Sequence, residues 1–126
     1  MFVAAGGGAV VREAPILAAI LEYLAIRQVY AWRQNSGAVK LADKTGKTRF
    51  VRFGFPGCSD IIGVIGHEIP EWEGRPLAIE VKSPTGKATM EQLVFLGEIA
   101  KRGGLAFIAR SVEDVERELA KPRRRA

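Results

Sequence analysis

Two charged residues separated by one valine, Glu80 and Lys82, are the strongest candidates for chemistry in this chain. They lie in the run Leu77–Lys82, whose apolar and β-branched residues predict a strand. Because side chains alternate along a strand, the carboxylate and the ammonium would project from one face, and Ile79 and Val81 from the other. An ionised pair that projects from an otherwise apolar strand requires an explanation.

A second carboxylate, Asp60, opens another short β-branched run that reaches Gly66. If the two runs form an antiparallel hairpin, pairing Asp60 with Glu80 centres the turn on Pro70, within a polar loop that already contains turn residues. The carboxylates would then repel each other unless one binds a proton or a cation lies between them. Oxygen ligands favour Mg²⁺ or Mn²⁺ over zinc, and the Val81 carbonyl could complete the protein's share.

A metal held in this way suits the hydrolysis of phosphodiester bonds. That reaction needs a hydroxide at neutral pH and relief of negative charge in the transition state, and a carboxylate-bound metal supplies both. Lys82 could orient the water or neutralise a phosphate oxygen. The chain has 19 Lys and Arg against 14 Asp and Glu, a net charge of +5, so a polyanion is the natural partner to test.

The first half of the chain must position Asp60. Apolar residues at three- and four-residue steps predict an amphipathic helix from Glu13 to about Val29. Tyr30–Arg33 and Thr48–Phe53 are expected to be extended, and the turn residues between them suggest a twisted antiparallel ribbon. Residues 1–11 are expected to form a flexible arm.

The second half follows the Glu80 strand. Thr89 and Gln92 have the spacing of a capping box, which predicts a helix that stops at Gly103-Gly104. Leu105–Ala109 reads as an apolar strand, and Ser111 with Asp114 opens a last helix that reaches Lys121-Pro122. The order αβββ(β)αβα predicts one α/β domain over residues 1–126, with a central mixed β-sheet flanked by helices and a basic tail at 121–126.

Three segments together resemble a known family. Gly57-Cys58-Ser59-Asp60-Ile61-Ile62-Gly63, then Ile79-Glu80-Val81-Lys82, then Gln92, are similar to the virus-type replication-repair nuclease (VRR-NUC) domain of the PD-(D/E)xK nuclease superfamily. The resemblance runs from about Glu13 to Arg110. Ser59 departs from the superfamily pattern, which often has proline before the aspartate.

The resemblance implies a restriction-endonuclease-like core in which Asp60 and Glu80 hold the metal, Lys82 assists the attacking water and Gln92 supports the site. Glu13 matches the family's acid on the first helix. It further implies a homodimer that cuts branched DNA, with four-way (Holliday-type) junctions as the leading substrate, in DNA repair or with a replication or repair protein as partner.

Other functions stay open. A flap or nicking nuclease without junction preference would need the same residues, as would a nuclease whose activity depends on a partner protein. From a different class, the chain could be a basic DNA-binding module that has lost catalysis. A panel of branched substrates would separate the first two nucleases, and binding without cutting under every metal would favour the module or the partner-dependent nuclease.

The site residues also have structural interpretations. Asp60, Glu80 and Lys82 could form a cross-strand salt-bridge cluster, although their joint spacing with Gln92 favours catalysis. Gln92 could only satisfy the backbone at the helix start, and Glu13 could only face a helix dipole.

Five cations are candidates for a phosphate track, although a plain solvated face would have the same composition; they are Arg33, Lys47, Arg49, Arg52 and Lys87. The aromatic residues near them are expected to lie mostly in the core rather than to stack on splayed bases; they are Trp32, Phe50, Phe53 and Phe55. The arginines of residues 123–125 could bind DNA or lie in solvent.

Cys58 and His67 are weak candidates for a thiol nucleophile, because no third orienting group is evident. A single cysteine cannot form an internal disulfide, and no apolar run reaches the roughly 20 residues that cross a bilayer. The expected location is therefore the cytoplasm.

Overall fold

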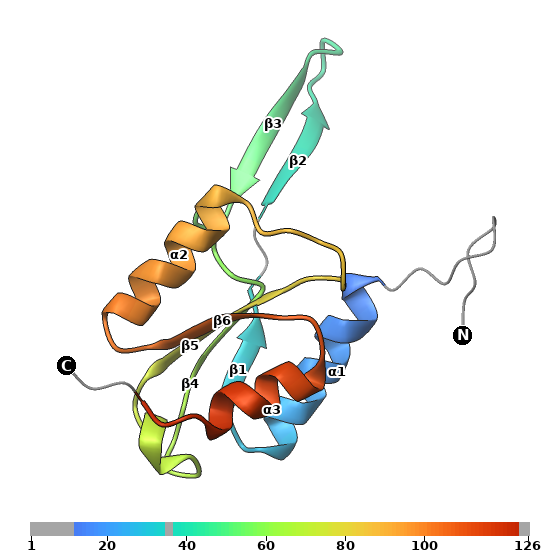
Figure 1. Ribbon diagram of the computed structural model, residues 1–126. Coiled ribbons are helices and arrows are strands. Elements are labelled where there is room, and N and C mark those ends of the chain that lie inside the picture. The colour runs from blue at the N-terminus through green and yellow to red at the C-terminus, as the bar shows by residue number, and fades with distance from the viewer. Residues whose placement is uncertain (1–11, 35–36, 124–126) are drawn as a thin grey trace, which may run out of the picture.

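The computed structural model describes residues 12–34 and 37–123, and for residues 37–39, 52 and 53 it describes the backbone alone. The expected N-terminal arm at 1–11 and the last residues of the basic tail lie outside this range. Within it, the chain is an α/β fold that consists of a four-stranded mixed sheet, three helices and a separate two-stranded ribbon (Figure 1).

The central sheet has the strand order β1-β4-β5-β6. Strand β1 (Tyr30–Arg33) is antiparallel to β4 (Ile61–Val64), and β4 is antiparallel to β5 (Pro76–Val81). Strand β6 (Leu105–Ala109) lies parallel to β5. The sheet is mixed, as predicted, because a hairpin joins β4 to β5 whereas a helical crossover joins β5 to β6.

Helices cover both faces of the sheet. Helices α1 (Glu13–Ile26) and α3 (Val112–Ala120) lie on one face, and α2 (Met90–Lys101) lies on the other (Figure 1). The main core forms between the sheet and the α1/α3 layer, and it includes Ile79 and Val81 of β5. Because alternate residues of a strand face opposite ways, Glu80 projects toward the α2 side.

The helix boundaries follow local chemistry. Thr89 caps α2 with the predicted reciprocal capping box, and the Ser111 hydroxyl accepts a hydrogen bond from the Asp114 N–H at the start of α3. Helix α1 ends at Ile26, three residues before the predicted end, because Gln28 has φ 61° and turns the chain into β1. Among the described residues, no helix has the length and apolar character needed to cross a membrane.

An antiparallel ribbon is present, as predicted, but it is formed by a different pair of strands. Tyr30–Arg33 is a strand, but it joins the central sheet as β1; the ribbon pairs β2 (Gly37–Ala42) with β3 (Thr48–Phe53). Five strands therefore precede α2. The predicted turn between β2 and β3 is present, because Asp43 Oδ1 accepts hydrogen bonds from the Thr45 and Lys47 N–H groups at 2.8 and 3.0 Å.

The expectation that most of the aromatic residues lie in the core is wrong. Trp32 is 41% exposed, Phe50 74% and Phe55 69%. The physical reason is tertiary, because Trp32 lies on the edge strand β1, Phe50 lies on a ribbon that projects away from the sheet (Figure 1), and Phe55 lies in the segment that follows the ribbon. The side chain of Phe53 lies outside the described part of the chain.

Candidate active site

The β4–β5 hairpin brings the two predicted carboxylates together. Ile61 pairs with Ile79, so the next residues outward, Asp60 and Glu80, lie opposite each other in the predicted register. Asp60 Oδ2 accepts a hydrogen bond of 2.8 Å from the Val81 N–H, which fixes the carboxylate against β5. The Asp60 carbonyl accepts another from the Gln34 N–H at 2.7 Å, which ties the residue to the end of β1.

Glu80 is the most unusual group of this site, because it is an ionisable residue that is only 2% exposed. Its Oε1 is buried and has no hydrogen-bond partner, whereas its Oε2 lies 3.5 Å from Lys82 Nζ. Burial raises the pKa of Glu80 to about 8, and the hydrogen bond and negative charge of Asp60 add to this rise, while Lys82 partly offsets it. At neutral pH and without a bound cation, the Glu80 carboxyl is therefore mostly protonated, because two ionised carboxylates would exceed the charge of the single ammonium.

Lys82 is buried on the same face of β5 as Glu80, as the alternation predicted. Its backbone N–H donates a 3.0 Å hydrogen bond to the carbonyl of Ala109 on β6. This bond extends the β5–β6 pairing beyond Val81 and holds the lysine at the edge of the sheet. The site thus combines two carboxylates and one cation on a rigid strand end.

The loop after Lys82 is held by Arg110, which the sequence analysis did not identify. Its Nη1 donates hydrogen bonds of 2.6 and 2.7 Å to the carbonyls of Ser83 and Gly86. Arg110 follows β6 directly, and parallel strands end at the same edge of a sheet. Its place after the predicted strand was the signal in the sequence, but only the parallel pairing shows which loop it contacts.

The segment before Asp60 packs tightly on α2. Gly57 has φ +76°, and a Cβ at this position would overlap with the backbone carbonyl of Glu91. Ser59 is fully buried, and its Oγ has no hydrogen-bond partner. Glycine is therefore required at position 57, because only a residue without a side chain lets this segment approach the α2 backbone so closely. The same segment leads into Asp60 at the start of β4.

Cys58 is half-buried beside the carboxylates, and this position opposes a role as nucleophile. Burial raises the pKa of its thiol, and the negative charges of Glu80 and Asp60 raise it further. A raised pKa keeps the protonated, unreactive form at neutral pH. His67, the other half of that hypothesis, lies beyond the opposite end of β4, where it pairs with Glu68 at 3.3 Å.

The two predicted supporting residues, Gln92 and Glu13, lie in the first turns of α2 and α1. Gln92 Oε1 accepts a 2.9 Å hydrogen bond from the Thr89 N–H, so the capping role is present and the amide nitrogen is the part left for a substrate. Glu13 is exposed in the first turn of α1, and its Oε2 would lie 3.6 Å from a Cβ placed on Gly86. Glu13 thus approaches the loop that follows Lys82, rather than the carboxylates themselves.

The predicted phosphate-binding cations are dispersed. Lys47 and Arg49 are exposed on the ribbon, Arg33 is exposed at the end of β1, and Lys87 is exposed in the loop before α2. Arg52 is on β3, but its side chain lies outside the described part of the chain. The described cations thus belong to three different elements, and no contact joins them into one track.

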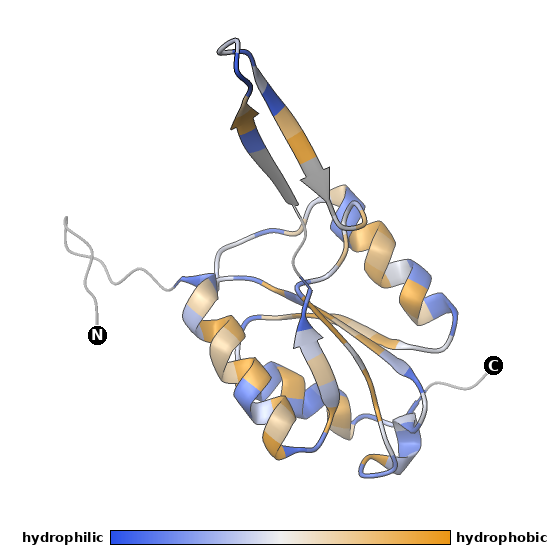
Figure 2. Cartoon of the chain, turned by 180° about the vertical axis from the view of Figure 1, so that it is seen from behind, coloured by the Kyte–Doolittle hydropathy of each residue, from blue (hydrophilic) through white to orange (hydrophobic). Residues whose placement is uncertain are grey.

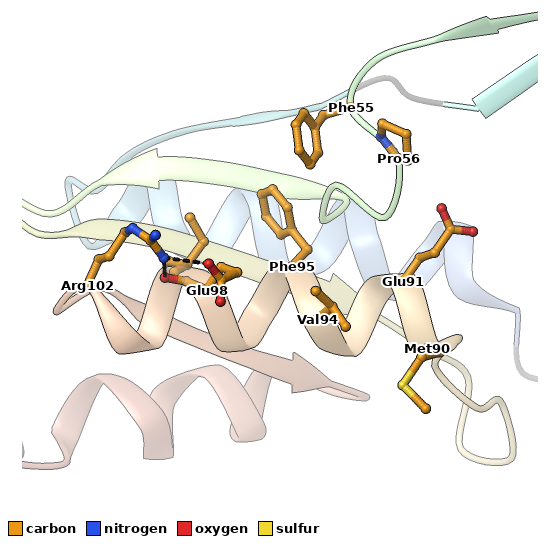
Figure 3. Close-up of a pocket in the computed structure, with 9 residues that line it drawn as sticks. Phe55, Pro56, Met90, Glu91, Val94, Phe95, Glu98 and Arg102 are labelled. Carbon is orange, nitrogen blue, oxygen red and sulfur yellow. Dashed lines mark hydrogen bonds and ion pairs between the residues drawn. The ribbon is translucent and has the colours of Figure 1, made fainter.

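A separate apolar groove of about 480 Å³ lies between α2 and the segment that follows β3 (Figure 3). Phe55 and Pro56 form one side, and the outer face of α2 forms the other; the α2 side chains are Met90, Glu91, Val94, Phe95, Glu98, Ile99 and Arg102. The Phe55 and Phe95 rings lie 6.1 Å apart. None of Asp60, Glu80 and Lys82 lines this groove.

The carboxylate oxygens of Asp60 and Glu80 are ligands of the kind that a divalent cation prefers. The buried Glu80 Oε1 has no partner and faces the same surface as Asp60, an arrangement that a hard cation would satisfy. However, the part of the chain that is described contains no cluster of three or more His, Cys, Asp or Glu side chains that could hold a metal. The ion would therefore depend on two carboxylates, backbone and water, as Mg²⁺ sites often do.

Comparisons of the chain with protein-family models, with curated proteins and with solved structures found no match. Any conclusion about function therefore depends on the geometry of the site and on the motif resemblance.

Proposed function

We propose that this chain is a divalent-metal-dependent endonuclease that hydrolyses DNA phosphodiester bonds. One observation carries the proposal: the buried Glu80 carboxylate lies across from Asp60 with an oxygen that has no partner. Buried side-chain oxygens without a hydrogen-bond partner are uncommon in proteins, and a bound ion is one arrangement that satisfies them. A purely structural salt bridge would not explain it, because Lys82 is close to only the other oxygen.

The cation proposed for the site is Mg²⁺ or Mn²⁺, held by Asp60 and Glu80, with the Val81 carbonyl as a further candidate ligand. When bound, it would lower the pKa of a water and offset charge on the phosphate oxygens. The Val81 N–H already holds Asp60 Oδ2, so one carboxylate oxygen is oriented before any cation arrives. Preorganised ligands of this kind reduce the cost of binding.

The other residues of the chain act on substrate and water. Lys82 is proposed to hydrogen-bond the attacking water or a phosphate oxygen, and the position of its ammonium beside the Glu80 carboxylate supports this role. Arg110 holds the loop that follows Lys82 and so acts as a positioning residue. Gln92 and Glu13 are proposed as supporting residues at the rim, and the four-stranded sheet is proposed to be a restriction-endonuclease-like core.

The proposed substrate is branched DNA, such as a four-way junction, and the proposed active form is a homodimer. Both come from the motif resemblance, and the net charge of +5 supports a polyanionic substrate.

The dimer is tested by light scattering of the purified chain across a range of concentrations. A monomer mass at every concentration, with and without DNA, would remove it from the proposal.

The nuclease is tested by cleavage of labelled four-way-junction, flap, duplex and single-stranded DNA with Mg²⁺, Mn²⁺ or EDTA. We expect metal-dependent cutting by the wild type and loss of at least about 100-fold in Asp60→Asn and Glu80→Gln. Glu116→Gln is the matched control, because Glu116 is an exposed carboxylate on α3, the opposite side of the sheet. Equal cutting by all variants would reveal a contaminant and reject the site.

A second candidate is a DNA-binding module without catalysis. The observation that favours it is the lack of any larger metal-binding cluster among the described residues, together with the ion pair between Lys82 and Glu80. This module would bind DNA in every buffer and cut in none. Isothermal titration with Mn²⁺ separates the two candidates, because only the nuclease loses Mn²⁺ binding on Asp60→Asn.

A further inference from the structure

The β2–β3 ribbon is an arm that extends away from the body of the protein (Figure 1). We call residues 37–53 the arm. Its strands hydrogen-bond to each other over the full length from Gly37–Phe53 to Ala42–Thr48, and they form their own sheet. Every residue from 40 to 50 is exposed. Residues 40–50 of the arm thus add nothing to the core, and their side chains are open for a partner on both faces.

The arm carries most of the excess positive charge of the chain. It contains five cations and a single carboxylate, so its net charge is +4, compared with +5 for the whole chain; the cations are Lys40, Lys44, Lys47, Arg49 and Arg52. The carboxylate, Asp43, accepts its hydrogen bonds within the turn, which lower its pKa. A polyanion is therefore the partner that the arm complements.

The arm also presents an aromatic ring to solvent. Phe50 is 74% exposed and is paired across the ribbon with Lys40, so the ring and the ammonium share one face. Figure 2 shows hydrophobic and hydrophilic bands close together on the arm. An exposed ring among cations is typical of surfaces that stack on unpaired bases while they contact the phosphates. A regular duplex offers no exposed base face to such a ring.

The base of the arm lies beside the candidate active site. Gln34 comes just before β2 and donates its backbone hydrogen bond to the carbonyl of Asp60, at 2.7 Å. On the other strand, residues 54–59 connect β3 to Asp60. Phe50 is ten residues from Asp60, so the chain between them spans at most about 35 Å. A strand bound along the arm would lead toward the two carboxylates.

We propose that the arm binds unpaired nucleotides of DNA, with the Phe50 ring stacked on a base and the Lys40 ammonium, on the same face, at a phosphate. The inference rests on the proposed nuclease function for the choice of DNA among polyanions. It adds a substrate feature to that function, namely unpaired bases next to the bond that is cut. Branch points, flaps and gaps all supply such bases, whereas an intact duplex does not.

The experiment measures DNA binding by fluorescence anisotropy in EDTA, where no cleavage takes place, so it does not depend on whether the chain is a nuclease. The two probes are a labelled thymidine oligonucleotide and an abasic oligonucleotide of the same length and charge. Phe50→Ala is compared with Phe50→Tyr, which keeps a stacking ring. Leu41→Ala is the matched control, because Leu41 is an exposed apolar residue that faces the other side of the arm.

We expect Phe50→Ala to weaken binding of the thymidine oligonucleotide by roughly 5- to 150-fold and to change binding of the abasic oligonucleotide by less than about twofold. Phe50→Tyr and Leu41→Ala should bind both probes like the wild type. Lys40→Ala should weaken both probes, more strongly at low salt. Because Phe50 is exposed, circular dichroism should show all variants folded.

Two results would overturn the inference. One is an equal effect of Phe50→Ala on both probes, which would leave only contacts to phosphate. The other is binding of vesicles that contain phosphatidylserine, lost in Phe50→Ala while DNA binding is unchanged, because the arm would then be a membrane-surface element. Absence of cleavage by the wild type with every metal, while the binding results above still hold, would reject the proposed nuclease function and leave the arm's role intact.

Discussion

Replacement of Glu80 by glutamine tests the electrostatic reasoning about the site without any substrate. Glu80 is buried and its pKa is raised from 4.5 to about 8 in the folded protein. Well below pH 4.5 the Glu80 carboxyl is protonated in both the folded and the unfolded chain, so its burial does not lower the stability through ionisation. As the pH rises toward 8, the unfolded chain releases its proton first, so stability falls through this window. The substituted glutamine cannot titrate, and its amide can donate to Asp60.

The magnitude follows from the two pKa values. For a carboxyl with pKa 4.5 unfolded and about 8 folded, linkage predicts that the free energy of unfolding falls by about 3 to 4 kcal/mol between pH 5 and pH 8. In Glu80→Gln this contribution disappears. We therefore expect the variant to be more stable than the wild type at pH 8 in EDTA, and similar to it at pH 5.

The assay is urea unfolding in EDTA at pH 5, 6, 7 and 8, followed by circular dichroism. Glu116→Gln is again the control, since an exposed carboxylate should leave the pH dependence of the wild type unchanged. The same slope of stability against pH in the wild type and in Glu80→Gln would refute the reasoning. Glu80 would then be ionised and well solvated at pH 7, and its unpaired oxygen would have no bearing on a cation.

Four further outcomes follow from single contacts. Lys82→Met should lower cleavage by about 100-fold or more, measured at saturating substrate, because the site loses the ammonium group proposed to contact the water or the phosphate. Arg110→Met should lower cleavage by about tenfold or more with little change in melting temperature, because the loop after β5 loses both of its side-chain anchors. Gly57→Ala should cost about 1–3 kcal/mol in urea unfolding through overlap with the α2 backbone, whereas Gly46→Ala, with similar φ but open space, should cost less. Thr89→Ala should cost about 1 kcal/mol by removal of the α2 cap, and a thermal melt that does not shift would contradict this.

The sequence alone determined the features that depend on neighbouring residues. Capping residues, turn residues and the alternation of side chains predicted both ends of α2, the start of α3 and the hairpin register that places Asp60 opposite Glu80. These features follow from local hydrogen bonds and from the alternation of side chains along a strand, and both depend only on the spacing of residues in the sequence. The predicted end of α1 was late because apolar periodicity continues through Val29, although Gln28 has already left the helix.

Only the tertiary structure decided which strands pair and which side chains are covered. The sequence shows that Tyr30–Arg33 is extended, but not that it joins β4 while β3 takes β2 as its partner. For the same reason most of the four aromatic residues around the ribbon were expected in the core, because the type of a residue does not show whether another layer packs on it. The burial of Glu80, the anchoring by Arg110 and the position of the arm beside Asp60 all depend on contacts between distant segments, and no local pattern encodes them.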